Sequence, residues 1–384
     1  MNRSTSAVPE WVRAWFPLVV LLVPLLLLAV FSRYYNGVLF VRIMTMMFIY
    51  IGLVVSLQTF MGNSGIASFA HVGFMLIGAY GSILFTMTSA QKSFTLPEMP
   101  TSWWLHSFHL PFGPALMLTG LVTAAFAGLI GIPLIRIGRT TLGFATFALL
   151  IVIRIVALSS DPLTRGTRTV VGISRFTTLE YAVGWALLAI VVSYLFKESG
   201  LGLRLRTARE DERAAAGIGV NIVWVRWAAW TLSAFMAAVA GGLWAHYITV
   251  FSPHAFWIPT NFLIISMLII GGQGSVAGAV VGTVVVSGVA EGLRSLEYTL
   301  NIQRQSVPLV AQLFPQQVVG ITDFALALAL LLILYRRPAG IMQGREFAWP
   351  FGGRKTPAPL PPVSPAAGSA GPASADGDGG KVST

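Results

Sequence analysis

The chain has no cysteine and few charged residues. The lack of cysteine among its 384 residues excludes disulfides, thiolate metal sites and cysteine nucleophiles. Charged residues make up 10% of the chain, whereas an ordinary soluble domain carries about a quarter, and 55% of the residues are hydrophobic. So few charges on so long a chain exclude a solvated globular enzyme and predict a polytopic membrane protein.

Motifs for nucleotide or metal chemistry are also missing. Gly380-Lys381 lacks a following Ser or Thr, so the sequence holds no phosphate-binding loop, and it holds no HExxH. We therefore expect no cofactor, metal or catalytic residue in this chain. Carboxylates within apolar segments are few, namely Glu291 and Asp323, with Glu180 at a rim. Proton-coupled carriers tend to use such carboxylates as relays, so their scarcity disfavours a secondary transporter.

Apolar runs of the length that a helix needs to cross a bilayer, roughly 20 residues, recur along the chain. They predict about ten transmembrane helices, of which 66–88, 260–272 and 276–294 are short or rich in glycine and could be broken or re-entrant. The others are 15–31, 38–60, 112–135, 141–158, 179–196, 226–247 and 316–335. The predicted fold class is an all-α polytopic membrane protein with a transmembrane domain over 15–345.

Lys and Arg gather in the segments that lie inside the cell if both termini are cytoplasmic: 1–14, 136–139, 197–226 and the part from Arg336 onward. We assign the formal net charge of +11 to this asymmetry and expect no nucleic-acid partner. The segment 159–178, with Arg165, Arg168 and Arg175, argues against this orientation. Residues 346–384, rich in Pro, Ala, Gly and Ser, form a tail that we expect to be disordered.

The 197–226 loop is predicted to contain a short charged helix. Leu, Ala, Arg and Glu dominate residues 203–216, and Gly217 and Gly219 are typical of a helix end. A charged helix held between two spans suits docking on a soluble cytoplasmic partner. The alternative is a solvated loop that only marks the cytoplasmic side.

Polar and small residues collect in segment 61–74, where a lipid-facing helix would be rich in leucine. Asn63, Ser64, Ser68 and His71 are therefore expected to face protein or an aqueous path. The alternative is interhelical hydrogen bonding without contact to a solute.

Small residues recur every four positions at Gly274, Gly278 and Gly282. At this spacing they would line one helix face and let a second backbone approach closely, so the pattern predicts helix packing.

These segments together resemble the permease subunits of branched-chain amino acid ABC importers. The similarity covers roughly residues 38–345 and is carried by Gly62-Asn63-Ser64-Gly65 with Ser68 and His71, Glu210-Asp211-Glu212-Arg213-Ala214-Ala215 with Gly219-Val220-Asn221, Ala245-His246-Tyr247, Gly271-Gly272-Gln273-Gly274-Ser275, and Arg337-Pro338-Ala339-Gly340-Ile341. Asn63 and Gly65 depart from the family's pattern. Arg165 and Arg168 intrude into its Thr-Gly-Gly-rich outer segment, which leaves the substrate open.

The resemblance implies a transport subunit, not an enzyme, embedded in the lipid of a bacterial inner membrane. Its implied partners are a second permease subunit, two cytoplasmic ATPase subunits and a periplasmic solute-binding protein. The 203–216 helix would couple to the ATPase through Arg204, Arg206, Arg209, Glu210, Glu212 and Arg213, with close contacts at Ala214, Ala215 and Gly219. The translocation pathway would be lined by residues such as Asn63, Ser64, Ser68 and His71.

Three alternatives stay open at this point. A sister importer for urea, short amides or aromatic acids would differ in its solute, much of whose selection falls to the binding protein. A stand-alone carrier or channel would transport without an ATPase. A polytopic membrane enzyme would need clustered His, Asp or Glu near one span end, and the sequence shows no such cluster.

Overall fold

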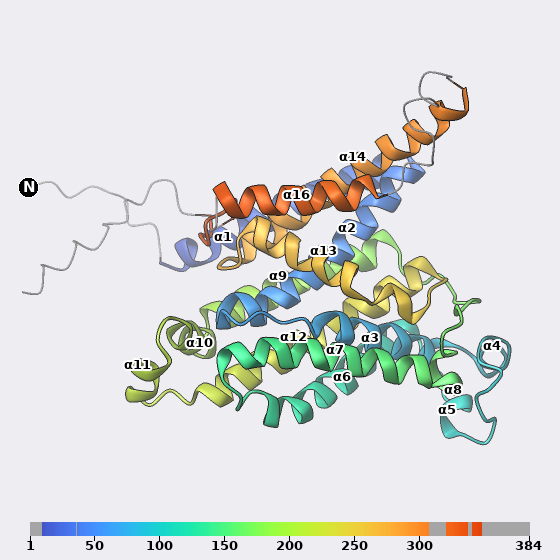
Figure 1. The fold of residues 1–384 in the computed structure, drawn as a ribbon, viewed down its shortest axis with the longest axis horizontal. Coiled ribbons are helices and arrows are strands. Elements are labelled where there is room, and N and C mark those ends of the chain that lie inside the picture. Colours follow the sequence, from blue (N-terminus) through green and yellow to red (C-terminus); the bar gives the residue numbers. More distant parts are fainter. Residues whose placement is uncertain (1–9, 36, 307–319, 337–339, 348–384) are drawn as a thin grey trace, which may run out of the picture. The chain divides into compact units, whose positions relative to one another are not determined.

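The computed structural model describes residues 10–35, 37–306, 320–336 and 340–347, which form helices joined by short connections (Figure 1). In chain order the elements are α1 (Glu10–Tyr34), α2 (Val38–Leu57), the π-helix η1 (Gln58–Gly62), α3 (His71–Thr86), α4 (Ser89–Thr95), α5 (Trp104–Ser107), α6 (Phe112–Leu134), α7 (Arg139–Ser159), α8 (Asp161–Thr164), α9 (Leu179–Glu198), α10 (Gly200–Glu210), α11 (Glu212–Gly217), α12 (Ile222–Ile248), the 3-10 helix η2 (Pro253–Ala255), α13 (Ile258–Gly271), α14 (Val276–Ser306) and α16 (Ile321–Arg336). An isolated β-bridge joins Val170 and Phe251.

The helices follow the predicted spans, which confirms the all-α polytopic fold class. Eight of the described helices are long and apolar enough to cross a membrane: α1 from Trp15, α2 with η1, α6, α7, α9, α12, α13 with η2, and α14. The shorter helices α3 and α16 lie over the predicted spans 66–88 and 316–335. Of the three segments expected to be irregular, 260–272 and 276–294 are continuous helices. In 66–88 the helix begins only at His71.

The centre of the bundle is α12, which packs mainly on α3, α6 and α2. Its contact with α3 depends on glycine. A Cβ on Gly78 would lie 2.0 Å from the carbonyl oxygen of Ala238, and one on Gly241 would lie 2.1 Å from that of Met75. The two backbones are therefore in direct contact, which is how helices associate where lipid removes the hydrophobic drive between them.

The predicted glycine face is only partly formed. Gly278 and Gly282 lie on α14 against α13, and a Cβ on Gly282 would lie 2.0 Å from the carbonyl oxygen of Met267. Gly274 lies before α14, whose first residue is Val276, and opposite Gly344. The prediction of one face was therefore wrong for Gly274, because the chain turns between α13 and α14 at that residue.

The single helix predicted over 203–216 is in fact two helices, α10 and α11. Asp211 between them is extended, with φ −147° and ψ 113°. Its carboxylate accepts hydrogen bonds from the backbone N–H groups of Arg213 at 2.8 Å and Ala214 at 3.0 Å. Aspartate is a favoured N-cap, so it ends one helix and starts the next.

The two ends of the chain lie largely outside the described residues. Of the predicted tail 346–384, the structure describes Glu346 and Phe347, and Glu346 makes contacts inside the helical body. The remainder of the tail lies outside the described residues, as do residues 1–9.

Candidate functional site

The residues proposed to contact an ATPase divide into an exposed set and an inward-facing set. Arg204, Glu210, Arg213, Ala214 and Gly219 are exposed on α10, α11 and the turn after them. Arg206, Arg209, Glu212 and Ala215 make contacts within the chain. Both sets were predicted to contact a partner. Arg206, Arg209 and Glu212 keep part of their surface exposed besides these internal contacts, so the partner role of both sets stays a prediction.

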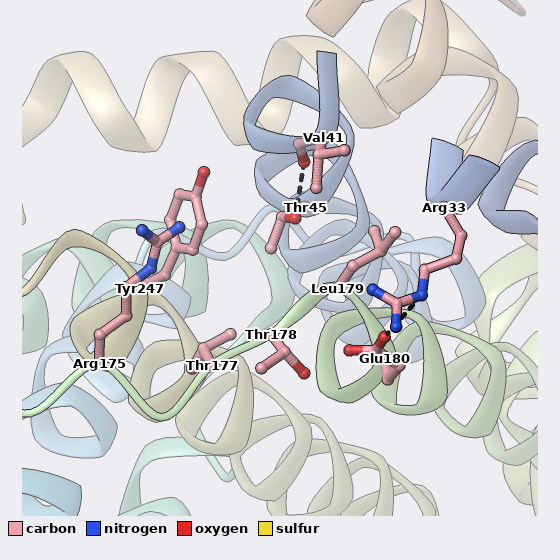
Figure 2. Close-up of a pocket in the computed structure, with 9 residues that line it drawn as sticks. All are labelled: Arg33, Val41, Thr45, Arg175, Thr177, Thr178, Leu179, Glu180 and Tyr247. Carbon is pink, nitrogen blue, oxygen red and sulfur yellow. Dashed lines mark hydrogen bonds and ion pairs between the residues drawn. The ribbon is translucent and has the colours of Figure 1, made fainter. Parts of the chain in front are cut away.

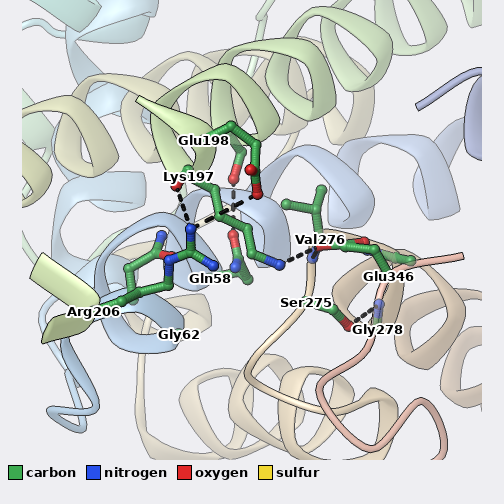
Figure 3. A network of polar contacts seen from close by, with 12 residues as sticks. Gln58, Gly62, Lys197, Glu198, Arg206, Ser275, Val276, Gly278 and Glu346 are labelled. Atoms are coloured by element: carbon green, nitrogen blue, oxygen red, sulfur yellow. Dashed lines mark hydrogen bonds and ion pairs between the residues drawn. The ribbon is translucent and has the colours of Figure 1, made fainter. Parts of the chain in front are cut away.

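The inward-facing residues tie α10 and α11 to the neighbouring spans. Arg206 Nη2 donates a hydrogen bond to the carbonyl oxygen of Lys197 at 3.0 Å (Figure 3). Glu212 forms an ion pair with Arg226 of α12, whose side chain is 5% exposed. Ala215 is fully buried. These contacts fix α10 on the end of α9 and α11 on the start of α12.

The polar segment 61–74 lies directly beside α10, and Arg209 Nη1 donates to the carbonyl oxygen of Gly62 at 2.6 Å. Gly62 is the last residue of η1 and also lies against the turn before α14. A Cβ on it would lie 2.3 Å from the carbonyl oxygen of Gln273. Glycine at this position therefore lets three parts of the chain meet: α10, the end of η1 and the α13–α14 turn.

All four residues predicted to line a pathway are buried in this chain. Asn63 Nδ2 donates to the carbonyl oxygen of Thr59 at 3.0 Å, and Ser64 Oγ accepts from the backbone N–H of Ile66 at 3.2 Å. Ser68 Oγ lies 3.0 Å from Nδ1 of His71. These bonds are local and not interhelical, so they decide neither for a pathway role nor for interhelical bonding, and the pathway role stays a prediction.

Two buried polar nitrogens beside this segment have no hydrogen-bond partner among the described residues: Nε2 of His71 and Nε2 of Gln58. Gln58 Oε1 accepts from Ser193 Oγ of α9 at 2.8 Å. Unsatisfied buried donors are costly unless water or another polar group reaches them. The sequence analysis missed Gln58, although a glutamine inside the apolar run 38–60 was the available signal.

A buried ion pair joins α9 to the segment after α16. Lys197 Nζ lies 2.5 Å from Glu346 Oε1, and the two side chains are 5% and 16% exposed (Figure 3). The same carboxylate accepts from the backbone N–H groups of Val276 at 2.8 Å and Ala277 at 3.1 Å, at the start of α14. Glu346 thus binds a cation and the positive end of a helix at once.

The 340–347 segment is held beside this ion pair by backbone hydrogen bonds. The N–H groups of Ile341 and Met342 donate to the carbonyl oxygens of Ile270 and Gly271, at 2.8 and 3.0 Å. The last turn of α13 therefore holds the segment that follows α16.

At the opposite end of the bundle, a cleft of about 300 Å³ opens between α1, α2, α9 and α12 (Figure 2). Arg33 and Glu180 lie 3.7 Å apart at one side of it, and both are exposed. At the other side the Arg175 guanidinium lies 5.2 Å from the centre of the Tyr247 ring. Thr45 and Thr177 form the polar floor. The cleft offers both signs of charge to a solute or a docking partner.

Near the same end, Lys92 of α4 is fully buried without a carboxylate. Its Nζ donates to the carbonyl oxygens of Leu105 at 2.7 Å and Phe108 at 2.5 Å. Burial lowers the pKa of the Lys92 ammonium to about 8. The two carbonyls hold the 88–111 segment together around this cation.

No grouping of three His, Asp or Glu side chains that could hold a metal ion occurs within the described ranges.

Comparisons with known proteins point to one family. A family model described as the permease component of branched-chain amino acid transport systems matches residues 39–334. A high-affinity branched-chain amino acid transport system permease protein LivM of Salmonella typhimurium is 27% identical over 295 residues, which cover 68% of this chain and 65% of that protein. The Escherichia coli K12 protein of the same description is 26% identical over 316 residues, covering 73% of this chain and 69% of that protein.

A second kind of relative matches a shorter stretch. The LivH permease protein of Salmonella typhimurium is 28% identical over 171 residues, covering 43% of this chain and 48% of that protein. The chain thus spans about two thirds of the LivM relatives and about half of the LivH relative. No solved structure gives a significant match.

Proposed function

Since this chain belongs to the family of permease components of branched-chain amino acid transport systems, we propose that it is a membrane-spanning subunit of an ATP-driven importer. Branched-chain amino acids are the proposed solute, because the LivM and LivH relatives carry that description. The chain would form the translocation pathway together with a second permease subunit. Two cytoplasmic ATPases would drive it, and a periplasmic solute-binding protein would deliver the solute.

The observation that carries this proposal is the surface of α10 and α11. These helices connect the end of α9 to the start of α12, and a groove of about 500 Å³ runs along them beside Leu203, Glu210 and Ala214. Arg206, Arg209 and Glu210 also line it, and Arg204 and Arg213 are exposed on the same two helices. A rigid, charged pair of short helices anchored to two spans can be moved as one body by a soluble partner.

The proposed orientation places α10 and α11 in the cytoplasm. Arg204 and Arg213 then lie on the side where positive charge is expected. Trp224 and Trp227 stack with ring centres 5.0 Å apart at the start of α12, at a depth suited to the bilayer interface. The cleft of Figure 2 would face the periplasm and the solute-binding protein.

The two arginines that left the substrate open are both engaged locally. Arg165 Nη1 donates to the carbonyl oxygen of Thr169 at 3.0 Å. Arg168 forms an ion pair with Glu98 at 3.2 Å. These contacts support a role for both in shaping the outer loop, and they give no reason to prefer an anionic solute. A sister importer for urea, short amides or aromatic acids is distinguished by the ligand of its binding protein.

The test is ATP-driven uptake by the complex reconstituted in liposomes, with leucine as the first solute. Arg213→Glu should lower both ATPase co-purification and uptake by about tenfold, the effect of an interface charge contact worth about 1.4 kcal/mol. Arg175→Glu, an exposed arginine at the opposite end, should leave ATPase binding unchanged. Uptake that proceeds without any ATPase would refute the proposal in favour of a stand-alone carrier.

A further inference from the structure

Two arginines join α10 to the polar segment 62–71. Arg209, near the end of α10, donates from Nη1 to the carbonyl oxygen of Gly62 at 2.6 Å. Arg139, the first residue of α7, donates from Nη1 to the carbonyl oxygen of Arg209 at 2.9 Å and from Nη2 to that of Gly65 at 3.1 Å. We call Arg139 and Arg209 together the arginine bridge.

The bridge is held by the electrostatics of helix ends. Gly62 ends η1 and Arg209 lies in the last turn of α10, where backbone carbonyls have no partner within their helix. Cations stabilise such C-terminal ends. Arg139 has no carboxylate partner among the described residues, and the Arg209 guanidinium is 3.8 Å from Glu210, beyond hydrogen-bond distance. The hydrogen bonds of both guanidiniums therefore go to backbone carbonyl oxygens.

Gly65 packs against both arginines of the bridge. It has φ +66°, which favours glycine. A Cβ there would lie 2.5 Å from Arg139 Nη2 and 2.9 Å from Arg209 Cγ. The residues that follow, up to Ala70, are not helical. A pull on Gly65 can therefore re-aim Ser68 without breaking a helix.

We propose that Arg139 and Arg209 are positioning residues that transmit the displacement of α10 to segment 62–71. This inference rests on the proposed function, since it assumes that an ATPase moves α10. When α10 shifts, the Arg209 guanidinium carries Gly62 with it, and Arg139 keeps the end of α10 and Gly65 at a fixed spacing. The nucleotide state of the ATPase thereby sets the conformation of the segment that leads into α3.

The two arginines differ in what can replace them. Arg209 donates to Gly62 through one nitrogen, which a lysine ammonium can imitate. Arg139 spans two carbonyls with its planar guanidinium, and a lysine, which is a point charge, does not reproduce that geometry. Arg209→Lys should therefore retain transmission and Arg139→Lys should lose it, an asymmetry that loss of net charge or of general stability does not produce.

The absence of cysteine makes a single-cysteine reporter direct. Ala67 is exposed in segment 62–71, so Ala67→Cys is modified with a water-soluble maleimide in the whole reconstituted complex, without nucleotide and with ATP trapped by vanadate. The modification rate should differ between the two states. Arg209→Gln and Arg139→Gln should each remove that difference and lower uptake by about tenfold, and Arg139→Gln, whose side chain does not line the docking groove, should do so while ATPase binding persists. Arg136→Gln, an exposed arginine three residues before Arg139, is the matched control.

The outcomes separate the bridge from the proposed function. If the native complex binds no ATPase or shows no ATP-driven uptake, the proposed function fails. If it transports but the Ala67→Cys rate is the same in both states, or if both Gln variants keep the difference, the bridge is overturned and the function stands. Loss of ATPase binding in Arg139→Gln would also overturn it, because Arg139 would then only support the docking surface.

Discussion

Breaking the ion pair between Lys197 and Glu346 by removing one partner should destabilise the chain strongly, because it leaves a buried charge without its counter-ion. Glu346→Gln keeps the shape of the side chain but leaves the Lys197 ammonium buried without its counter-ion, 5% exposed. Removing one partner of a buried pair costs about 3–5 kcal/mol of unfolding free energy. Lys197→Met leaves the carboxylate bound to two backbone N–H groups of α14, so it should cost less, about 1.5–3 kcal/mol.

The double variant Lys197→Met with Glu346→Gln should cost less than the sum of the two single changes, because the charge stranded by each is removed by the other. The assay is isothermal denaturant unfolding of the purified chain in detergent, followed by tryptophan fluorescence. Glu180→Gln is the control, since its pair with Arg33 is exposed and 3.7 Å long and should contribute less than about 1 kcal/mol. If Glu346→Gln cost no more than Glu180→Gln, the reasoning would be refuted.

Three further predictions concern single positions. Gly282→Ala should destabilise the chain by about 1–3 kcal/mol because its Cβ would meet the α13 backbone, whereas Gly288→Ala, on the same helix with open space around it, should be neutral or stabilising in the same unfolding assay. Asp211→Ala should cost about 1 kcal/mol through loss of the α11 cap and lower ATPase co-purification, and unchanged co-purification would show that α11 does not need its cap to dock. Burial lowers the pKa of Lys92 to about 8 in the folded chain, whereas it is about 10.4 in the unfolded chain. Between about pH 8 and about pH 10 the unfolded chain therefore binds more protons than the folded chain, so the free energy of unfolding should rise with pH. Resistance of the 88–111 segment to proteolysis should therefore increase from about pH 8 to about pH 10, and this increase should be missing in Lys92→Met.

The helices could be located from the sequence because a span must be apolar along its whole length. Each predicted span overlaps a helix in the described ranges, including the glycine-rich pair that became α13 and α14. The break at Asp211 could not be located from propensity, since Arg, Glu and Ala on either side all favour a continuous helix. The break lies at Asp211 because its side chain caps the N–H groups of Arg213 and Ala214. These bonds outweigh the helix propensity of the neighbouring residues only where the chain must turn toward α12.

Contacts between distant parts of the chain were beyond local patterns. Glu346 stands where the composition changes toward Pro and Gly, so it was placed in the tail. Its partner Lys197 is 149 positions away and gives no signal of the pairing. The same holds for Arg139 and its contact with Gly65, because a base beside a span predicts only which side of the membrane it lies on.

Local patterns also could not separate the exposed residues of α10 and α11 from the inward-facing ones. Charge at helical spacing predicted a charged surface but could not say which face turns inward. Arg206 and Arg209 lie toward the spans, whereas Arg204 and Arg213 lie toward the exterior of the chain. Which side a charged residue occupies depends on the carbonyl oxygens of α9 and η1 that it meets, and these are contributed by other elements.

The proposed coupling requires contact between the exposed face of α10–α11 and an ATPase. The most direct measurement is site-specific cross-linking in the native complex, with one cysteine introduced at a time into this cysteine-free chain. Ala214→Cys should form an adduct with the ATPase, and Thr178→Cys, exposed at the opposite end, should form none. An ATPase adduct from Thr178→Cys, with none from Ala214→Cys, would contradict the account.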